Sequence, residues 1–126
     1  MSNTQRLPKA ERLHSLKVIR RLFTDGESAF AYPFRYMVIR ESGEQPGVEV
    51  LFSVPKRYHK RANKRNLLKR RMREAYRQHK AELVAMAVER GLRIELALIY
   101  TSKDIVSYKS VENAVCKVLE RVAKCD

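Results

Sequence analysis

A run of lysines and arginines between residues 56 and 80 carries the clearest chemistry in this sequence. Twelve of these 25 residues are basic and one, Glu74, is acidic, so the run holds +11 of the chain's net charge of +13. Lysine and arginine donate charge-assisted hydrogen bonds to phosphate, and arginine does so in a bidentate geometry. Such a local excess of charge repels itself unless a partner neutralises it, and it therefore predicts a surface that binds a polyanion.

The spacing within this run is that of an α-helix from about residue 62 to residue 88. One face is an apolar stripe at three- and four-residue spacing, formed by Leu68, Met72, Ala75 and Tyr76. At about 100° per residue, another face is formed by Asn66, Arg70, Arg73 and Arg77, with Lys69 at its margin. Like charges at these spacings destabilise an isolated helix by about 0.2–0.5 kcal/mol per pair. Phosphate groups on this face would remove that repulsion.

Three other roles for the run are weaker. A solvated face that only keeps the protein soluble usually explains four or five charges rather than twelve. A helix lying on a membrane needs a lipid-anchoring stripe, whereas this one, with Ala75 and Tyr76, suits a protein core. A helix-turn-helix regulator of DNA needs a second helix after a short turn, but strands flank this helix.

The elements that must position the basic helix follow from local patterns. A short amphipathic helix is predicted at residues 16–24, with Ser15 as N-cap and Gly26 as stop. Strands are predicted at residues 32–40 and 48–54, joined by turn residues 42–47 into an antiparallel hairpin. After the basic helix, Gly91 precedes an apolar inner strand at residues 92–100, and a last helix occupies residues 110–124.

These elements predict one α+β domain over residues 1–126, with residues 1–11 as a mobile basic arm. The order is α-β-β-(β)-α-β-α, where the optional strand requires a bend within residues 48–54. Helices on one face of a small sheet make a two-layer sandwich. No apolar run approaches the roughly 20 residues that span a bilayer, and residues 1–9 lack the apolar core of a signal peptide. We therefore expect a cytoplasmic protein.

Residues 53–77, SVPKRYHKRANKRNLLKRRMREAYR, resemble the signature of the bacterial ribonuclease P protein subunit. The matching positions are Arg65, Asn66, Lys69, Arg70, Arg73, Glu74, Ala75 and Tyr76. Leu67 stands where the family has a third basic residue, and Ile19 stands where it usually has an aromatic one. The resemblance extends over roughly residues 11–119.

The resemblance implies a two-layer α+β sandwich with a left-handed βαβ crossover, in which the arginine-rich helix is the crossover element. It implies a subunit of ribonuclease P, the endoribonuclease that removes the 5′ leader of precursor tRNA. The expected partners are the catalytic RNA and precursor tRNA, with no membrane and no DNA partner. Catalysis and most of the bound Mg²⁺ would belong to the RNA, and no residue of the protein is assigned to a metal.

Two surfaces are expected on this basis. The surface for the catalytic RNA comprises Lys60, Arg61, Lys64, Arg65, Asn66, Lys69, Arg70, Arg73 and Arg77. A cleft for the single-stranded leader, between the first helix and the sheet, comprises Phe23, Phe34, Tyr36, Lys56 and Arg57. Exposed aromatic side chains stack on unpaired bases, although aromatics at strand and helix spacing are more often core residues.

Catalytic groups within the protein are not expected. The histidines His14, His59 and His79 are far apart in the sequence, lack a paired base and are expected at the surface. Cys116 and Cys125 lack the spacing of metal ligands. The alternative function is a ribosomal or RNA-chaperone protein without enzymatic activity that uses the same basic helix.

Overall fold

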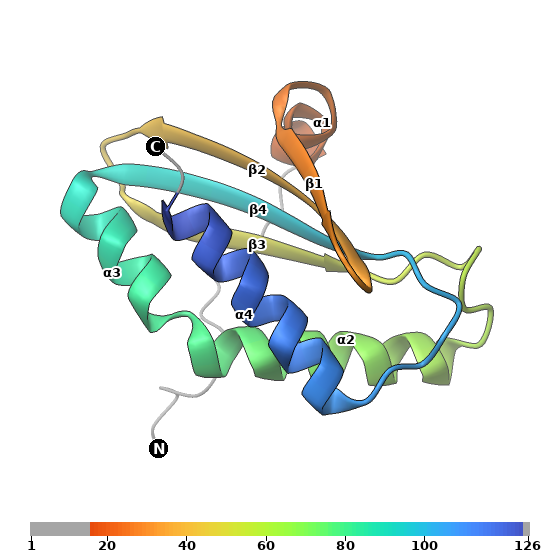
Figure 1. The fold of residues 1–126 in the computed structure, drawn as a ribbon. Coiled ribbons are helices and arrows are strands. Elements are labelled where there is room, and N and C mark those ends of the chain that lie inside the picture. Colours follow the sequence, from red (N-terminus) through yellow and green to blue (C-terminus); the bar gives the residue numbers. More distant parts are fainter. Residues whose placement is uncertain (1–15, 125–126) are drawn as a thin grey trace, which may run out of the picture.

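The computed structural model describes residues 16–124, and this part of the chain forms four helices and four strands (Figure 1). In chain order these are α1 (Leu16–Asp25), β1 (Glu27–Ala31), β2 (Phe34–Ser42), β3 (Gly47–Ser53), α2 (Ala62–His79), α3 (Ala81–Arg90), β4 (Leu92–Tyr100) and α4 (Tyr108–Lys124). The predicted α+β class is confirmed. The predicted basic arm at residues 1–11 and the predicted cap at Ser15 lie outside the described residues.

The strands form one mixed sheet in the order β1-β2-β4-β3. β4 pairs antiparallel with β2, with Phe34 opposite Tyr100, and parallel with β3, with Val48 opposite Ile94. The predicted hairpin of β2 with β3 is therefore wrong, because β4 lies between them. Residues 94–98 of β4 are all buried, and a strand that is apolar on both faces is stable only inside a sheet with both faces covered.

The connection from β3 to its parallel neighbour β4 runs through α2 and α3. The single helix predicted for residues 62–88 is thus two helices that meet at Lys80, and Gly91 ends the second one with φ of 66°. In Figure 1 both strands run from left to right, β4 lies above β3, and the covering helices face the viewer. This arrangement makes the crossover left-handed, as the family resemblance implies.

β1 is an edge strand that the sequence did not predict. The sequence allows an extra strand only through a bend in residues 48–54, but those residues belong to the single strand β3. Four of the five residues of β1 are exposed, and only Ala31 is buried. The segment therefore lacks the alternation of apolar and polar residues by which a half-buried strand is recognised.

The sheet has a different helix layer on each face. The main core lies under α2, α3 and α4, and its largest fully buried side chains include Tyr76, Tyr100 and Phe34. On the opposite face, which we call the α1 face, Leu22 of α1 packs in a separate, smaller core with Met37 and Ala97. Figure 1 shows α1 apart from the other three helices. The predicted two layers thus become three, since α1 packs on the face of the sheet opposite α2, α3 and α4.

Candidate nucleic-acid interface

The exposed face of α2 is the one that the helical spacing predicts. Leu68, Met72, Ala75 and Tyr76 are buried and anchor the helix. On the other side of the helix, Asn66, Arg70 and Arg73 are exposed, and Lys69 and Arg77 at their flanks are half-buried. The same rotation that buries the apolar stripe therefore presents a row of cations to solvent.

Most cations of this surface lack an acidic partner. Among the residues that the structure describes, six of them have a side chain that makes no ion pair and no hydrogen bond, namely Lys60, Arg61, Lys64, Lys69, Arg70 and Arg73. Arg77 differs, because its Nε donates to Glu74 Oε1 at 3.2 Å. This bond helps to hold the pKa of Glu74 below its usual range. Six uncompensated charges within residues 60–73 fit a polyanionic ligand. We call these six residues the α2 cation surface.

Two arginines of the basic run bond to the protein itself. Arg65 donates from Nη1 to the carbonyl oxygens of His59 at 3.0 Å and Lys60 at 2.7 Å. Arg71 donates to the carbonyl of Val106 in the segment before α4. Arg65 thus shapes the loop before α2, a role that the sequence did not reveal. Its remaining N–H groups still leave it able to reach a phosphate, so its assignment to RNA contact stays a prediction.

His59 also organises this loop, and its predicted surface position is wrong. Its side chain is buried, Nε2 lies 2.8 Å from the carbonyl oxygen of Ser102, and the ring packs edge-on against Tyr100 at 5.5 Å. His79 is exposed and pairs with Glu112 at 2.8 Å, and His14 lies outside the described residues. His59 thus attaches the loop before α2 to Tyr100 of β4 and to Ser102 after it. The loop therefore presents its lysines and arginines in a defined position.

Lys56 and Arg57, predicted to contact the leader, follow directly after β3. Both are exposed, and the Arg57 guanidinium lies 5.6 Å from the centre of the Tyr58 ring. They are therefore available to a ligand that approaches the end of β3.

The aromatic residues predicted for the cleft divide into two groups. Phe23 on α1 is 56% exposed and is accessible to a ligand. Phe34 and Tyr36 are buried in the main core beneath α2, α3 and α4, on the sheet face opposite α1. The prediction that these two stack on unpaired bases is wrong. Alternation along β2 shows that they share a face, but it does not show which helix covers that face.

Arg35, which lies between Phe34 and Tyr36, points instead to the α1 face, together with the residues paired with it across the sheet. The strand registers align one row of side chains there, which consists of Phe30, Arg35, Ile99 and Ser53. Phe30 and Arg35 are exposed, and Ile99 and Ser53 are half-buried. We call this the open row. The sequence did not predict Phe30 or Arg35, although Arg35 alternates with two core residues and must face the other way.

The other end of the α1 face is covered by α1 and carries carboxylates paired with arginines. Arg21 pairs with Glu41, and its Nη1 lies 3.7 Å from Glu95 Oε1. Glu95 is buried, and desolvation raises its pKa in spite of Arg21. Arg93 pairs with Glu49 beside it. These carboxylates are paired with arginines, and α1 covers this end of the face, so the open row is its accessible part.

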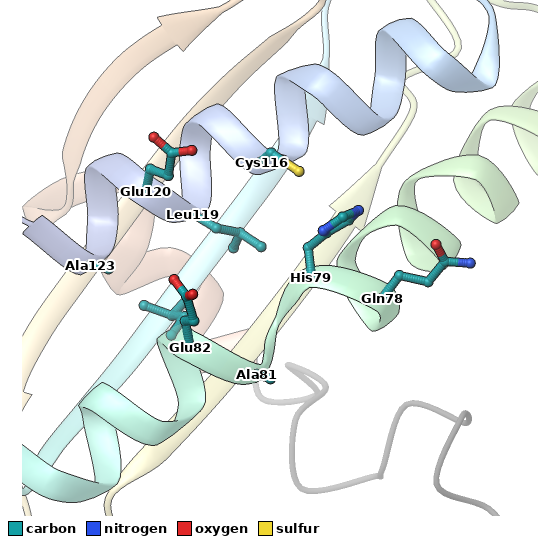
Figure 2. Close-up of a pocket in the computed structure, with 9 residues that line it drawn as sticks. Gln78, His79, Ala81, Glu82, Cys116, Leu119, Glu120 and Ala123 are labelled. Atoms are coloured by element: carbon teal, nitrogen blue, oxygen red, sulfur yellow. The ribbon is translucent and has the colours of Figure 1, made fainter.

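A cavity of about 330 Å³ between the α2–α3 junction and α4 is unsuited to phosphate. Figure 2 shows the carboxylates of Glu82 and Glu120 beside it, together with His79 and Cys116. Burial raises the pKa of the Cys116 thiol, which keeps it protonated and unreactive at neutral pH. Cys125 lies outside the described residues. This cavity is therefore separate from the cationic surface.

Within residues 16–124, no group of three or more histidine, cysteine or acidic side chains is placed to hold a metal ion. The same part of the chain contains no helix long and apolar enough to span a membrane.

Comparison with known proteins identifies the family. A family model described as Ribonuclease P matches residues 7–123 of the chain. The chain belongs to the ribonuclease P protein family. The ribonuclease P protein component of Porphyromonas gingivalis is 36% identical over 119 residues, which cover 93% of this chain and 86% of that protein. The corresponding protein of Chlorobium phaeobacteroides is 29% identical over 127 residues, covering 92% and 87%.

Solved structures of ribonuclease P proteins share this fold. A mutant of the Staphylococcus aureus RNase P protein matches with a TM-score of 0.73 at 21% identity, over 90% of this chain and 89% of that chain. The RNase P protein of Thermotoga maritima matches with a TM-score of 0.67 at 21% identity, over 88% and 96%. At these identities the likeness concerns the fold, and the family assignment rests on the sequence matches.

Two departures from the ribonuclease P signature now have positions in the fold. Leu67 is half-buried on the flank of α2, outside its exposed row of cations. Ile19 is half-buried on α1, which leaves Phe23 as the aromatic side chain of that helix. Phe23 is therefore the aromatic side chain that α1 exposes to solvent.

Proposed function

We propose that this chain is the protein subunit of ribonuclease P and that it binds the catalytic RNA through the α2 cation surface. The observation that carries this proposal is the row of cations without acidic partners, in a chain of the ribonuclease P family. Asn66 lies among these cations, and Arg77 lies at their edge with one carboxylate already bound. Phosphates of a structured RNA would supply the missing countercharge.

The 5′ leader of precursor tRNA is the second ligand in this proposal. The surface for it lies between α1 and the sheet, where Phe23 is exposed and where Lys56 and Arg57 follow the end of β3. Phe23 would stack on an unpaired base, and the two cations would contact neighbouring phosphates. Binding the leader as well as the tRNA body makes the holoenzyme favour precursor over product.

The protein assists the cleavage by positioning RNA. In keeping with the family resemblance, we place the reaction centre and its Mg²⁺ in the catalytic RNA; the exposed nitrogen cations of α2 would not serve as ligands for Mg²⁺, which takes oxygen ligands. Within the described residues, the two histidines are engaged with Ser102 and Glu112 and do not form a catalytic pair. A complex of this chain with the catalytic RNA and precursor tRNA would act in the bacterial cytoplasm, where these RNAs are found.

Reconstitution tests this function. The protein is added to a bacterial ribonuclease P RNA and precursor tRNA at a Mg²⁺ concentration too low for the RNA alone. We expect cleavage at the 5′ end of the mature tRNA to be restored, and no restoration with either component alone. A protein that binds the RNA tightly without restoring cleavage would instead be a ribosomal or RNA-chaperone protein, and the proposed function would be rejected.

A further inference from the structure

Phe30 is a large aromatic side chain on the surface of β1 with no structural task in the described residues. It is 59% exposed and belongs to neither hydrophobic core. Its neighbour Ala31 is buried, so the strand already has its anchor in the core. An exposed phenylalanine on an edge strand promotes unwanted association. A ligand that covers the ring would give this residue a function.

The strand register places Phe30 on the α1 face. Phe30 lies opposite Arg35 on β2, and Ser28 lies opposite Met37, which packs in the small core under α1. Residues directly opposite one another in a sheet point to the same side. Phe30 therefore shares its face with the surface proposed for the leader.

The positions of Phe30 and Arg35 are fixed by hydrogen bonds from both sides of the sheet. Arg121 of α4 donates from Nη1 to the Phe30 carbonyl at 3.1 Å. Arg35 donates from Nε to Ser28 Oγ at 3.1 Å, and this bond does not use its terminal nitrogens. A ring on an anchored strand beside an oriented guanidinium is a preorganised pair for a base and its phosphate.

The open row connects this pair to the cations at the end of β3. Four adjacent strands at about 4.8 Å spacing span about 14 Å from Phe30 to Ser53. Lys56 and Arg57 follow Ser53 by a few residues and are exposed. The far end of the same face is covered by α1, whose Arg21 pairs with Glu41 of β2 and whose Leu22 packs on Met37 and Ala97. A single strand of RNA that enters at Lys56 is thus directed along the open row toward β1.

We propose that Phe30 stacks on one unpaired base of the 5′ leader and that Arg35 contacts the adjacent phosphate. The leader site of this chain thereby extends across the sheet to its edge strand. The aromatic surface missing from α1, where Ile19 is aliphatic, is supplied by β1. This inference rests on the proposed function, because it requires the leader as ligand.

The test measures the affinity of the reconstituted holoenzyme for precursor tRNAs with leaders of increasing length and for mature tRNA. Phe30→Ala removes the ring, Phe30→Leu keeps apolar bulk without stacking, and Phe30→Trp keeps an aromatic surface. Val88→Ala on α3 is the matched control, since it shortens another exposed apolar side chain. Circular dichroism checks folding, and sedimentation records the oligomeric state.

We expect Phe30→Ala and Phe30→Leu to weaken binding of long-leader precursors by about 5- to 150-fold, the range found for loss of one stacked base. Binding of mature tRNA and of the shortest leaders should not change. Phe30→Trp and Val88→Ala should bind every RNA as the original chain does.

Two results would overturn the inference while leaving the proposed function standing. One is equal affinity of Phe30→Ala and the original chain at every leader length, in a holoenzyme that still prefers precursor. The other is a change in oligomeric state with no change in leader binding, which would make Phe30 a contact between copies. A holoenzyme with no preference for precursor would instead reject the proposed leader site as a whole.

Discussion

Arg73→Ala should weaken binding of the catalytic RNA and at the same time stabilise the free protein. Arg73 is exposed, and among the described residues it has no acidic partner. Lys69 and Arg70 lie four and three residues before it on α2, and each like-charge pair of this kind is destabilising by about 0.2–0.5 kcal/mol. Arg77, four residues after Arg73, is left out because Glu74 compensates its charge. Loss of both repulsions should raise the free energy of unfolding by about 0.4–1 kcal/mol at low salt.

The effect on binding follows from counterion release. The α2 cation surface contributes six basic side chains, and if each neutralises one phosphate, the logarithm of the binding constant falls with the logarithm of the salt concentration with a slope of about −5. That slope corresponds to an affinity loss of about 10³-fold between 50 and 200 mM salt. Removing Arg73 should make the slope shallower by about 0.9.

Arg71→Ala is the matched control on the same helix. The Arg71 guanidinium bonds to the Val106 carbonyl and ties α2 to the segment before α4. Its loss should lower stability by about 1–2 kcal/mol and leave the salt slope nearly unchanged. Filter binding of the catalytic RNA from 50 to 400 mM salt and urea unfolding provide the two readouts. Equal slopes for Arg73→Ala and the original chain, or lower stability of Arg73→Ala, would refute the reasoning.

Two further changes address the α1 face. Leu22→Ala removes the fully buried contact between α1 and the sheet, so it should lower the free energy of unfolding by about 2–4 kcal/mol. Hydrogen exchange should accelerate more in α1 than in α2, and precursor preference should fall more than affinity for the catalytic RNA. Equal acceleration of exchange in both helices would contradict this. Glu95→Gln addresses a carboxyl whose pKa burial raises. The folded state then binds the proton more tightly, so stability falls as pH rises from the ordinary pKa through the raised one. The advantage of the glutamine variant in urea unfolding should grow over that interval, by about 1.4 kcal/mol per unit of raised pKa, and a constant difference would contradict this.

Local sequence patterns correctly predicted the elements in which buried residues form a continuous apolar run or a regular helical stripe. β4 was predicted at residues 92–100 and extends from Leu92 to Tyr100, because its apolar run is continuous. The exposed face of α2 was predicted because a 3.6-residue period separates Arg73 from Met72 without knowledge of the fold. Neither apolar runs nor periodicity within a segment reveals which strands pair with one another. A short turn between β2 and β3 favours a hairpin, yet the demand of β4 for two neighbours and two covered faces prevails.

In the candidate site, too, local patterns predicted some residues, whereas the positions of others depend on the fold. Arg70 and Arg73 were predicted from periodicity and are exposed as expected. Phe34 and Tyr36 were assigned to the wrong face, since alternation groups residues without orienting them. Phe30 was not predicted because β1 lies at an edge and carries exposed residues at four of five positions. Its role becomes visible only when the register places it beside Arg35 on the side covered by α1.

The central position of β4 also has a consequence for biosynthesis. Two of the sheet's three ladders require β4, which follows α2 and α3 in the chain. On the ribosome, β2 and β3 therefore emerge without their principal partner, and the arginine-rich helix emerges before the sheet on which it packs. Non-local pairing of this kind slows folding. A nascent chain that ends before residue 92 can form the β1–β2 pair but neither of the two ladders that contain β4, so we expect the sheet to be completed only after β4 has been synthesised.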